Sequence, residues 1–439
     1  MGSGMIRTMK KRVIAGLSAI AILMISTTAS AEWGDGVGEG AFRLHPGLSL
    51  SMGYDSNIFH SSGSGFGQLS QAPSGTIEPF LSVQTVNASS WDLSGRAGVS
   101  WQQYLSPQAN VRNQSGLAAS VDGSALWNSD GPVSLQLSER FVRTNETPNY
   151  VSGTPINRIF NKAGVRAGLH PGGRVLETFA SYDFSLYRHN RFRDLDRHTH
   201  HLGWDGSWSF LPKTSIVANV DYRMIRYQEP MLGTDRISNP EGRLVNSDSN
   251  PLRVMGGLAG QFTPRISFNL RGGYGWGFYE VGPTTQQALA ETTLSYQFGN
   301  IEFDNRFRLG YRFGFNDSSI GNFYRYHRAV AGYQQGFVGD RLRLGVDVDA
   351  QMRSYASLGI DEIQTENNRI SIPDQLSDLL LGVNGTINYG IRKGWDVGLR
   401  YSFRSNFSED QIVIDGIAED AALRDYQRHN VVLSTTLRY

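Results

Sequence analysis

Cysteine is absent from the 439 residues, which excludes a disulfide scaffold and thiolate metal sites. Charge of neither sign is in excess, because the formal net charge is +1. The composition therefore does not point to nucleic acid or to an acidic partner. The low mean hydropathy argues against membrane-spanning helices. It suits a β-barrel, in which only every second strand residue meets lipid.

Long apolar runs are missing apart from one at the start of the chain. This run, Val13–Ser26, follows a cluster of Arg and Lys and precedes the small-residue triplet Ala29–Ala31. That order is typical of a secretory signal peptide, and the run is too short for a comfortable transmembrane helix. We therefore predict a signal peptide with a short N-terminal extension over residues 1–31, cleaved after Ala31. Residues 32–44 are Gly-rich and polar, and we expect a periplasmic lead-in there.

The last ten residues, Asn430–Tyr439, alternate between apolar and mostly polar side chains and end on an aromatic ring. A period of two is typical of a strand that is apolar on one side. A chain that stops on such a strand resembles the closing strand of a bacterial outer-membrane barrel. Eighteen segments show a similar alternation. They lie near residues 46–59, 76–86, 91–105, 114–127, 132–144, 159–170, 175–187, 198–210, 215–227, 251–262, 266–279, 288–298, 301–313, 324–337, 341–355, 378–391, 395–405 and 427–439.

The connections between these segments alternate between short turns and long loops, such as Asn128–Gly131 and 145–158. Short periplasmic turns and longer extracellular loops are the outer-membrane pattern. Aromatic residues gather at both strand ends, and charge is rare on the outward face. Glu139 and Asn305 break that rule, so we expect a bulge or a rim position there. The sequence predicts an all-β transmembrane antiparallel barrel of about 18 strands over residues 45–439, with both termini in the periplasm.

Function has to come from the inward face, which carries Gly, Ser, Asn and charged residues. The predicted lumen-lining residues are Arg96, Arg140, Arg166, Arg271, Arg306, Arg308, Arg312, Arg353, Arg400, Arg404, Asp92, Asp304, Asp347 and Asp396. Guanidinium groups suit carboxylate, phosphate or sulfate groups on a passing solute. Arg and Asp can equally pair across strands and only stiffen the wall. Both readings stay open.

Other motifs give weaker signals. His198, His200 and His201 stand together, but no third and fourth metal ligand is identifiable, so we expect a polar rim and no metal. Gly272–Gly277 lacks the helix and the Lys-Ser/Thr of a phosphate loop, and its glycines are expected to relieve crowding. No catalytic constellation is recognisable, so we expect neither an enzyme nor a cofactor. The loops 356–377 and 406–426 are either solvated surface or a lid, and a helical turn is possible at Glu419–Arg424.

The first strand ends in Gly53-Tyr54-Asp55-Ser56-Asn57-Ile58-Phe59. This stretch resembles the signature of a family of outer-membrane β-barrel porins that recur in exopolysaccharide gene clusters. The resemblance covers the mature chain in outline. It implies export of a secreted polysaccharide and a periplasmic polysaccharide-export or co-polymerase partner that delivers it. Asp55 and Asn57 would then bind sugar hydroxyls or, as we expect, order the first loop at the barrel rim.

The favoured hypothesis is therefore an outer-membrane channel that translocates an exopolysaccharide from the periplasm to the cell surface. One alternative is a diffusion porin, either general or selective for small anions or sugars. A third is a plugged barrel used for adhesion or assembly. The expected partners are outer-membrane lipid and lipopolysaccharide, and a polysaccharide or small polar solute, with no nucleic acid.

Overall fold

The computed structural model of the chain describes most residues after the predicted signal peptide. The described ranges are 34–38, 41–61, 69–86, 90–145, 157–171, 175–190, 193–228, 247–280, 282–299, 303, 305–318, 322–337, 339, 341–356, 362–364, 369–371, 376–408, 412–414, 417–419 and 425–439. The predicted signal peptide and Asp304 lie outside these ranges. Within them, no helix is long and apolar enough to cross a membrane.

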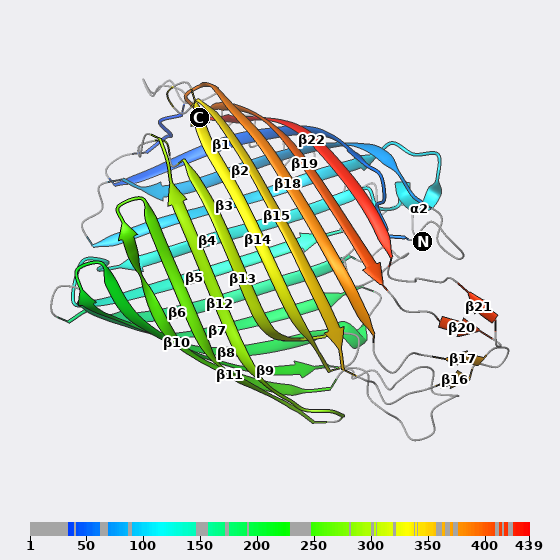
Figure 1. Cartoon of the computed structure of the whole chain (residues 1–439). Coiled ribbons are helices and arrows are strands. Elements are labelled where there is room, and N and C mark those ends of the chain that lie inside the picture. Colours follow the sequence, from blue (N-terminus) through cyan, green and yellow to red (C-terminus); the bar gives the residue numbers. More distant parts are fainter. Residues whose placement is uncertain are drawn as a thin grey trace.

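Eighteen antiparallel strands form one sheet that closes on itself (Figure 1). They are β1 (Phe42–Asp55), β2 (Ala72–Thr85), β3 (Trp91–Tyr104), β4 (Gly116–Trp127), β5 (Val133–Thr144), β6 (Arg158–Leu169), β7 (Leu176–His189), β8 (Arg197–Leu211), β9 (Thr214–Tyr227), β10 (Ser249–Thr263), β11 (Ile266–Tyr279), β12 (Thr285–Gln297), β13 (Arg306–Asp317), β14 (Phe323–Phe337), β15 (Leu342–Tyr355), β18 (Ser377–Arg392), β19 (Trp395–Ser408) and β22 (Tyr426–Arg438). Each of these strands pairs with the next one in this order. The short strands that lie between β15 and β18, and between β19 and β22, belong to loops and are not part of this sheet. The first strand also pairs with the last, and this pairing closes the barrel.

The predicted fold class and strand number are confirmed, but several boundaries were wrong. The first strand begins at Phe42, inside the predicted lead-in 32–44, and the second begins at Ala72 and not near residue 76. The first strand stops at Asp55, and residues 56–59 turn away from the sheet. The thirteenth strand begins at Arg306 rather than near residue 301, so the connection between β12 and β13 spans residues 298–305, where two residues were predicted. That connection is longer than the ones at 280–284 and 318–322, which are on the loop side. The alternation of short and long connections is therefore a strong tendency and not a strict rule.

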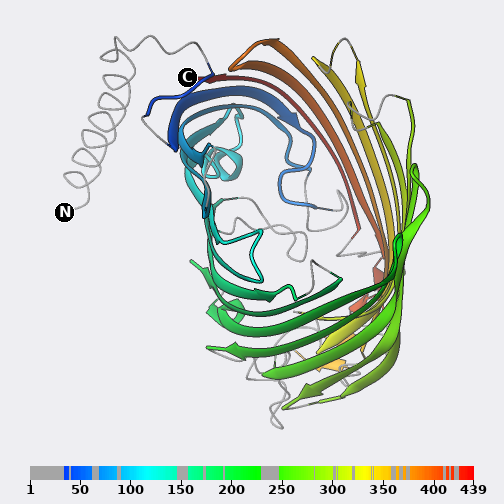
Figure 2. The ribbon, with the colours of Figure 1, turned by 90° about the vertical axis from the view of Figure 1, so that its left-hand side faces the viewer.

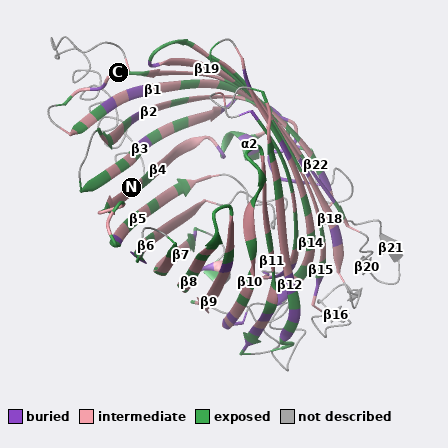
Figure 3. Cartoon of the chain, turned by 60° about the vertical axis from the view of Figure 1, so that its left-hand side comes forward, coloured by how far each residue is buried: buried purple, intermediate pink, exposed green. Residues whose placement is uncertain are grey.

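The outer wall is apolar and exposed, as the period of two requires. Leu50, Met52, Trp101, Leu270 and Val348 are examples of large apolar side chains that are at least two-fifths exposed in the isolated chain. So much contiguous exposed apolar surface marks contact with lipid. Figure 3 shows how exposure changes from residue to residue along the strands. The inward face, in contrast, carries the polar and charged residues described below.

Glu139 points outward from the middle of β5 without any bulge. It stays in register with Gly123 on β4 and Ala163 on β6, so neither expected explanation for this residue holds. The side-chain amide of Asn161 on β6 donates a hydrogen bond to its carboxylate. A polar partner on the adjacent strand therefore compensates this acid on the lipid-facing wall. Asn305 lies in the connection before β13, where its side chain accepts a hydrogen bond from the backbone of Gly336.

A unit of three rings recurs on the outer wall. In each unit a tyrosine, a phenylalanine two residues later and a histidine on the following strand lie together. The histidine Nδ1 is 2.7–2.9 Å from the tyrosine hydroxyl, and its ring centroid is 4.6–5.2 Å from that of the phenylalanine. The units are Tyr182, Phe184 and His200; Tyr311, Phe313 and His327; and Tyr401, Phe403 and His429. Each unit satisfies a tyrosine hydroxyl on a surface that faces lipid.

The loops carry little regular structure of their own. A short helix, α2 (Ala109–Arg112), and a 3-10 turn, η1 (Arg193–Leu195), lie in two of them. The predicted loops 356–377 and 406–426 pair with each other through β17 (Arg369–Ser371) and β20 (Ile412–Ile414). With β16 (Glu362–Gln364) and β21 (Ile417–Glu419) these form a small sheet beyond the ends of β18 and β19 (Figure 1). Glu419 ends a strand, and the rest of the predicted helical turn, 420–424, lies outside the described residues.

Candidate functional site: a charged lumen wall

The predicted lumen residues that the structure describes all lie on the inward face. Cross-strand pairing fixes this, because partners that face each other point to the same side of the sheet. Arg96 lies opposite Asp122, Asp122 opposite Arg140, and Arg140 opposite Lys162, which extends one inward row across four strands. In the same way Arg271 faces Glu291, and Glu291 faces Arg312.

Positive charge is concentrated on one side of this wall. On β13–β22 the inward cations are Arg306, Arg308, Arg312, Arg328, Arg343, Arg353, Arg400, Arg404, Arg428 and Arg438. The inward acids on the same strands are Asp317, Asp347, Asp349, Asp378 and Asp396. On β1–β12 inward acids and cations are nearly balanced. A solute in the lumen therefore meets a positive face along β13–β22, which we call the cationic wall. A low-dielectric enclosure strengthens such a field.

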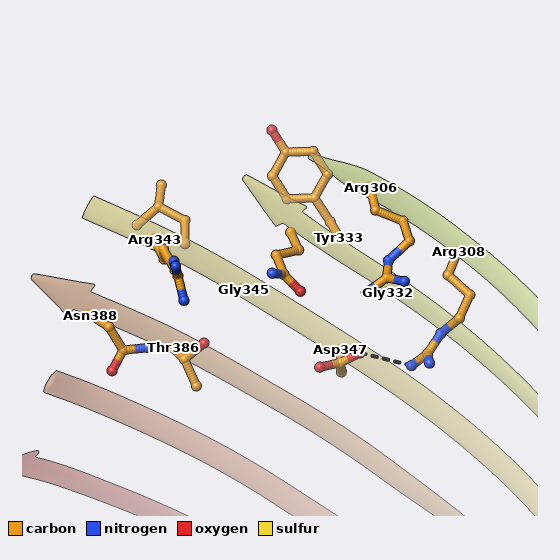
Figure 4. A pocket seen from close by; sticks show the side chains of 11 residues that line it. Arg306, Arg308, Gly332, Tyr333, Arg343, Gly345, Asp347, Thr386 and Asn388 are labelled. Atoms are coloured by element: carbon orange, nitrogen blue, oxygen red, sulfur yellow. Dashed lines mark hydrogen bonds and ion pairs between the residues drawn. The ribbon is translucent and has the colours of Figure 1, made fainter. Parts of the chain in front are cut away.

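A pocket of about 340 Å³ opens in the cationic wall. Arg306 and Arg308 border it from β13 and Arg343 borders it from β15, while Asp347 is its one acid (Figure 4). Asp347 lies 3.4 Å from Arg308, so the pocket retains a positive excess. Gln334, Thr386 and Asn388 add hydrogen-bonding groups. Three guanidinium groups beside neutral polar side chains suit an anionic solute better than a neutral one.

Several of the predicted arginines pair with acids across strands. Arg353 and Asp378 form the tightest of these pairs, with Nε 2.5 Å and Nη2 2.8 Å from the carboxylate oxygens, and both side chains are largely buried. More exposed pairs join Arg312 to Glu291 at 3.0 Å and Arg96 to Glu78 at 2.8 Å. These contacts fit the interpretation in which charged residues stiffen the wall.

Other predicted residues have looser surroundings. Arg166 lies over the ring of Phe179 and 3.7 Å from Asp205. Arg271 donates hydrogen bonds to neutral Asn269 and Asn219. Asp92 accepts a hydrogen bond from Thr85, and Asp396 lies 3.5 Å from Arg438.

Arg140, Arg400 and Arg404 have no hydrogen-bond or ion-pair partner among the described residues. Arg404 even lies opposite another cation, Arg428. A cation without a local partner interacts with water or with a solute. The lumen therefore contains arginines that pair with acids and arginines without such a partner. These are the two roles that the sequence left open.

The signature residues form the seam at which the barrel closes. Asp55, at the end of β1, is nearly inaccessible and binds the Arg428 guanidinium of β22 through both carboxylate oxygens, at 2.5–3.1 Å. Asn57 is fully buried, and its side-chain amide donates to the backbone oxygens of Ser61 and Gln427. Both residues order the first loop at the rim, and neither exposes polar atoms for binding a sugar.

The other residues of the signature also contact neighbouring parts of the chain. Gly53 faces the lumen, where a Cβ would lie 3.0 Å from the Val431 oxygen, and Tyr54 points outward and donates a hydrogen bond to Gln71. Phe59 packs with Ile58, Ala72, Tyr104 and Val111 in a buried cluster. In the view of Figure 2, the segment after β1 and helix α2 lie inside the ring of strands. They line part of the extracellular mouth.

His60, a residue that no sequence pattern singled out, completes the seam. Its ring is buried, its Nε2 accepts a hydrogen bond from Arg428 at 3.0 Å, and its φ is +54°. Burial, and then the positive charge of Arg428, lowers the pKa of His60 from 6.5 to about 3. His60 is therefore neutral at physiological pH, which keeps it compatible with the guanidinium beside it.

The three neighbouring histidines divide between the two faces. His198 and His200 point outward, and His200 belongs to one of the ring units. His201 points inward, 2.9 Å from Asp183 and 2.6 Å from Asp221. Among the residues that the structure describes, no group of three or more potential ligands could hold a metal ion.

Comparison with known proteins finds likeness in structure only. No protein-family model matches the chain, and neither does any curated protein. A mutant of the ferric enterobactin receptor PfeA from Pseudomonas aeruginosa, in complex with enterobactin, is 9% identical with a TM-score of 0.50, over 92% of this chain and 82% of that one. The siderophore receptor PirA from the same organism is 11% identical with a TM-score of 0.44, over 91% and 81%. OccAB4 from Acinetobacter baumannii is 12% identical with a TM-score of 0.42, over 90% and 98%.

At these identities the likeness shows the fold alone. Together with the apolar outer wall and the charged inner wall, it defines an outer-membrane β-barrel. Which solute uses the barrel has to be argued from the lumen of this chain.

Proposed function

We propose that this barrel is an export channel for an acidic exopolysaccharide, which it guides from the periplasm to the cell surface. The observation that carries the proposal is the cationic wall, where inward arginines outnumber acids along β13–β22. Several of these arginines pair with acids, but their surplus over the acids leaves the wall with a net positive charge, and a net positive charge attracts a polyanion along its path. Eighteen strands are wide enough to enclose an aqueous channel unless it is blocked.

The pocket at Arg306, Arg308 and Arg343 supports this role. Guanidinium forks recognise carboxylates, and the amides and hydroxyl beside them can contact sugar hydroxyls. Binding has to remain weak if the polymer is to move, and an open, partly solvated site provides that. The resemblance of Gly53–Phe59 to porins of exopolysaccharide gene clusters points the same way. It also suggests a periplasmic export or co-polymerase partner that delivers the polymer.

A diffusion porin for small anions is the second candidate. The pocket is large enough for a small anion as well as for part of a polymer, with a volume of about 340 Å³ and three arginines in its lining. Deletion of the protein separates the two functions. Export predicts loss of secreted polysaccharide with unchanged uptake of small acids, whereas a diffusion porin predicts the reverse.

Planar bilayers test the channel directly. We expect the purified chain to conduct, and an acidic oligosaccharide to interrupt the current at much lower concentration than a neutral one of equal length. Arg306→Gln with Arg308→Gln should weaken this block by about thirtyfold, since each of the two charge-assisted contacts contributes roughly 1 kcal/mol near a solvated wall. Arg325→Gln is the matched control, because Arg325 lies on the outward face of β14. Equal block by acidic and neutral sugars would refute the proposal, and absence of current would indicate a plugged barrel.

A further inference from the structure

Basic side chains gather on the outer wall at the loop ends of β5, β7, β8 and β9. We call this set the outer cationic patch, and it consists of the guanidinium groups of Arg143, Arg188 and Arg226 with the imidazoles of His198 and His200 beside them. Each arginine precedes the last residue of its strand, and His198 is the second residue of β8. The patch thus lies at the level where the long loops leave the barrel, which is the extracellular boundary of the membrane.

The register brings these cations close together. Arg143 on β5 and Arg188 on β7 are both cross-strand partners of Ile159 on β6. They are therefore two strand spacings apart, about 10 Å between Cα atoms, and their side chains can reach a common group between them. His198 lies opposite Arg226 on β9, which extends the row.

The cations of the patch differ in how they are held. Arg226 is fixed by Asp248 at 3.5 Å and by the side chain of Asn250 at 2.9 Å. Arg143 and Arg188 are exposed, and no described residue gives either of them a hydrogen bond or an ion pair. Glu139, the outward acid of β5, accepts a hydrogen bond from Asn161 and lies four residues from Arg143 along the strand. The three arginines outnumber Asp248 and Glu139, so the patch keeps a positive excess.

The position of the patch is informative because the outer wall otherwise avoids charge. Among the described residues at the loop ends of the strands, Arg325 on β14 is the one other outward arginine. A cation on the lipid-facing wall costs several kcal/mol at the membrane midplane and almost nothing at the boundary. Exposed arginines that cluster at that depth meet lipid head groups rather than acyl chains.

We propose that the outer cationic patch binds the phosphate groups of a phosphorylated glycolipid in the outer leaflet. Arg143 and Arg188 would bind a phosphate from both sides of Ile159. The imidazoles of His198 and His200 and the guanidinium of Arg226 would face the neighbouring part of the head group. Charge complementarity supports this occupant, because phosphate is the anion that arginine forks bind best at a wet boundary. The site is independent of the solute that passes through the lumen.

The test compares the intact protein with the double variant Arg143→Gln/Arg188→Gln, both refolded in detergent. Lipid A and its dephosphorylated form are titrated separately, and bound lipid is counted by native mass spectrometry. We expect the wild type to prefer lipid A, and the double variant to bind it about thirtyfold more weakly, since each of the two arginines near an anionic surface contributes roughly 1 kcal/mol.

Arg325→Gln serves as the matched control, because it removes the same charge from an outward position with no clustered cations. It should bind lipid A like the wild type. Retained heat-modifiable mobility on gels would show that each variant is folded. Equal affinity of wild type and double variant for lipid A, or equal affinity of the wild type for both lipids, would overturn the proposal. Inorganic phosphate that binds as well as lipid A would show a free-anion site instead and would also overturn it.

Discussion

Arg428 on the last strand and Asp55 on the first strand face each other across the seam of the barrel, with Nη2 and Oδ2 2.5 Å apart. The carboxylate also accepts hydrogen bonds from Arg428 Nε, from the Asn57 backbone and from the side chain of Asn430. These contacts give the signature Gly53–Phe59 a structural role. The same few residues join the first strand to the last and hold the first loop in place.

The first prediction concerns this pair. Asp55→Asn leaves the Arg428 guanidinium without its counter-charge, and breaking a buried pair costs about 3–5 kcal/mol. We expect a large drop in the temperature at which the folded form disappears on unheated gels. Arg438→Gln is the control, because its pair with Asp396 is about half exposed and such pairs contribute roughly 0–1 kcal/mol. An equal effect of the two substitutions would contradict the structural role of Asp55.

His60 should make the seam sensitive to acid. Its pKa is about 3 in the folded protein, and the ordinary value is 6.5. The unfolded chain therefore binds an additional proton between these values, so stability falls as the pH drops from about 6.5 to about 3 and levels off below. His60→Asn removes this titration and tolerates the positive φ. Denaturant midpoints measured across that range should fall more steeply for the wild type than for the variant. Parallel pH profiles would show that His60 does not titrate as described.

The glycines of β11 give a steric prediction. A Cβ at Gly275 would lie 2.7 Å from the ring of Phe315, which turns into the lumen and packs against Arg253. Gly275→Val should therefore displace that ring and cost about 1–3 kcal/mol. Gly385→Val is the control, because nothing lies within 4 Å of a Cβ at Gly385 on β18. Thermal unfolding of both variants checks the prediction, and it fails if Gly275→Val is as stable as Gly385→Val.

The regular part of the barrel was predictable because every strand repeats one pattern. Alternation alone located eighteen strands and assigned Arg96 or Arg400 to the inward face. It did not reveal that residues 56–61 leave the sheet and turn inward. Ile58 fits the apolar alternation of the first strand in the sequence, but in the structure it packs in the buried cluster with Phe59. The ring units were also missed. Tyr401 and His429 lie on different strands, so only the cross-strand register shows that they meet.

The partners of individual arginines could not be read from the sequence either. Whether an inward arginine meets an acid depends on the stagger between strands, which the alternation of residues does not specify. Arg353 meets Asp378 directly across β15 and β18, whereas Arg400 meets Thr386 across β18 and β19. The sequence thus identified the lumen residues and left their two possible roles open.

The last prediction separates those two roles. Arg400 and Arg404 have no hydrogen-bond or ion-pair partner among the described residues, so Arg400→Gln/Arg404→Gln should reduce the preference of the pore for anions and leave stability nearly unchanged. Arg353→Gln should instead lower stability and leave the preference for anions nearly unchanged. It leaves the buried carboxylate of Asp378 without its counter-charge, which destabilises the barrel by about 3–5 kcal/mol. Reversal potentials in a salt gradient and thermal unfolding measure the two effects. If the Arg400/Arg404 variant unfolds early with unchanged selectivity, these arginines support the wall and do not face a conducted solute.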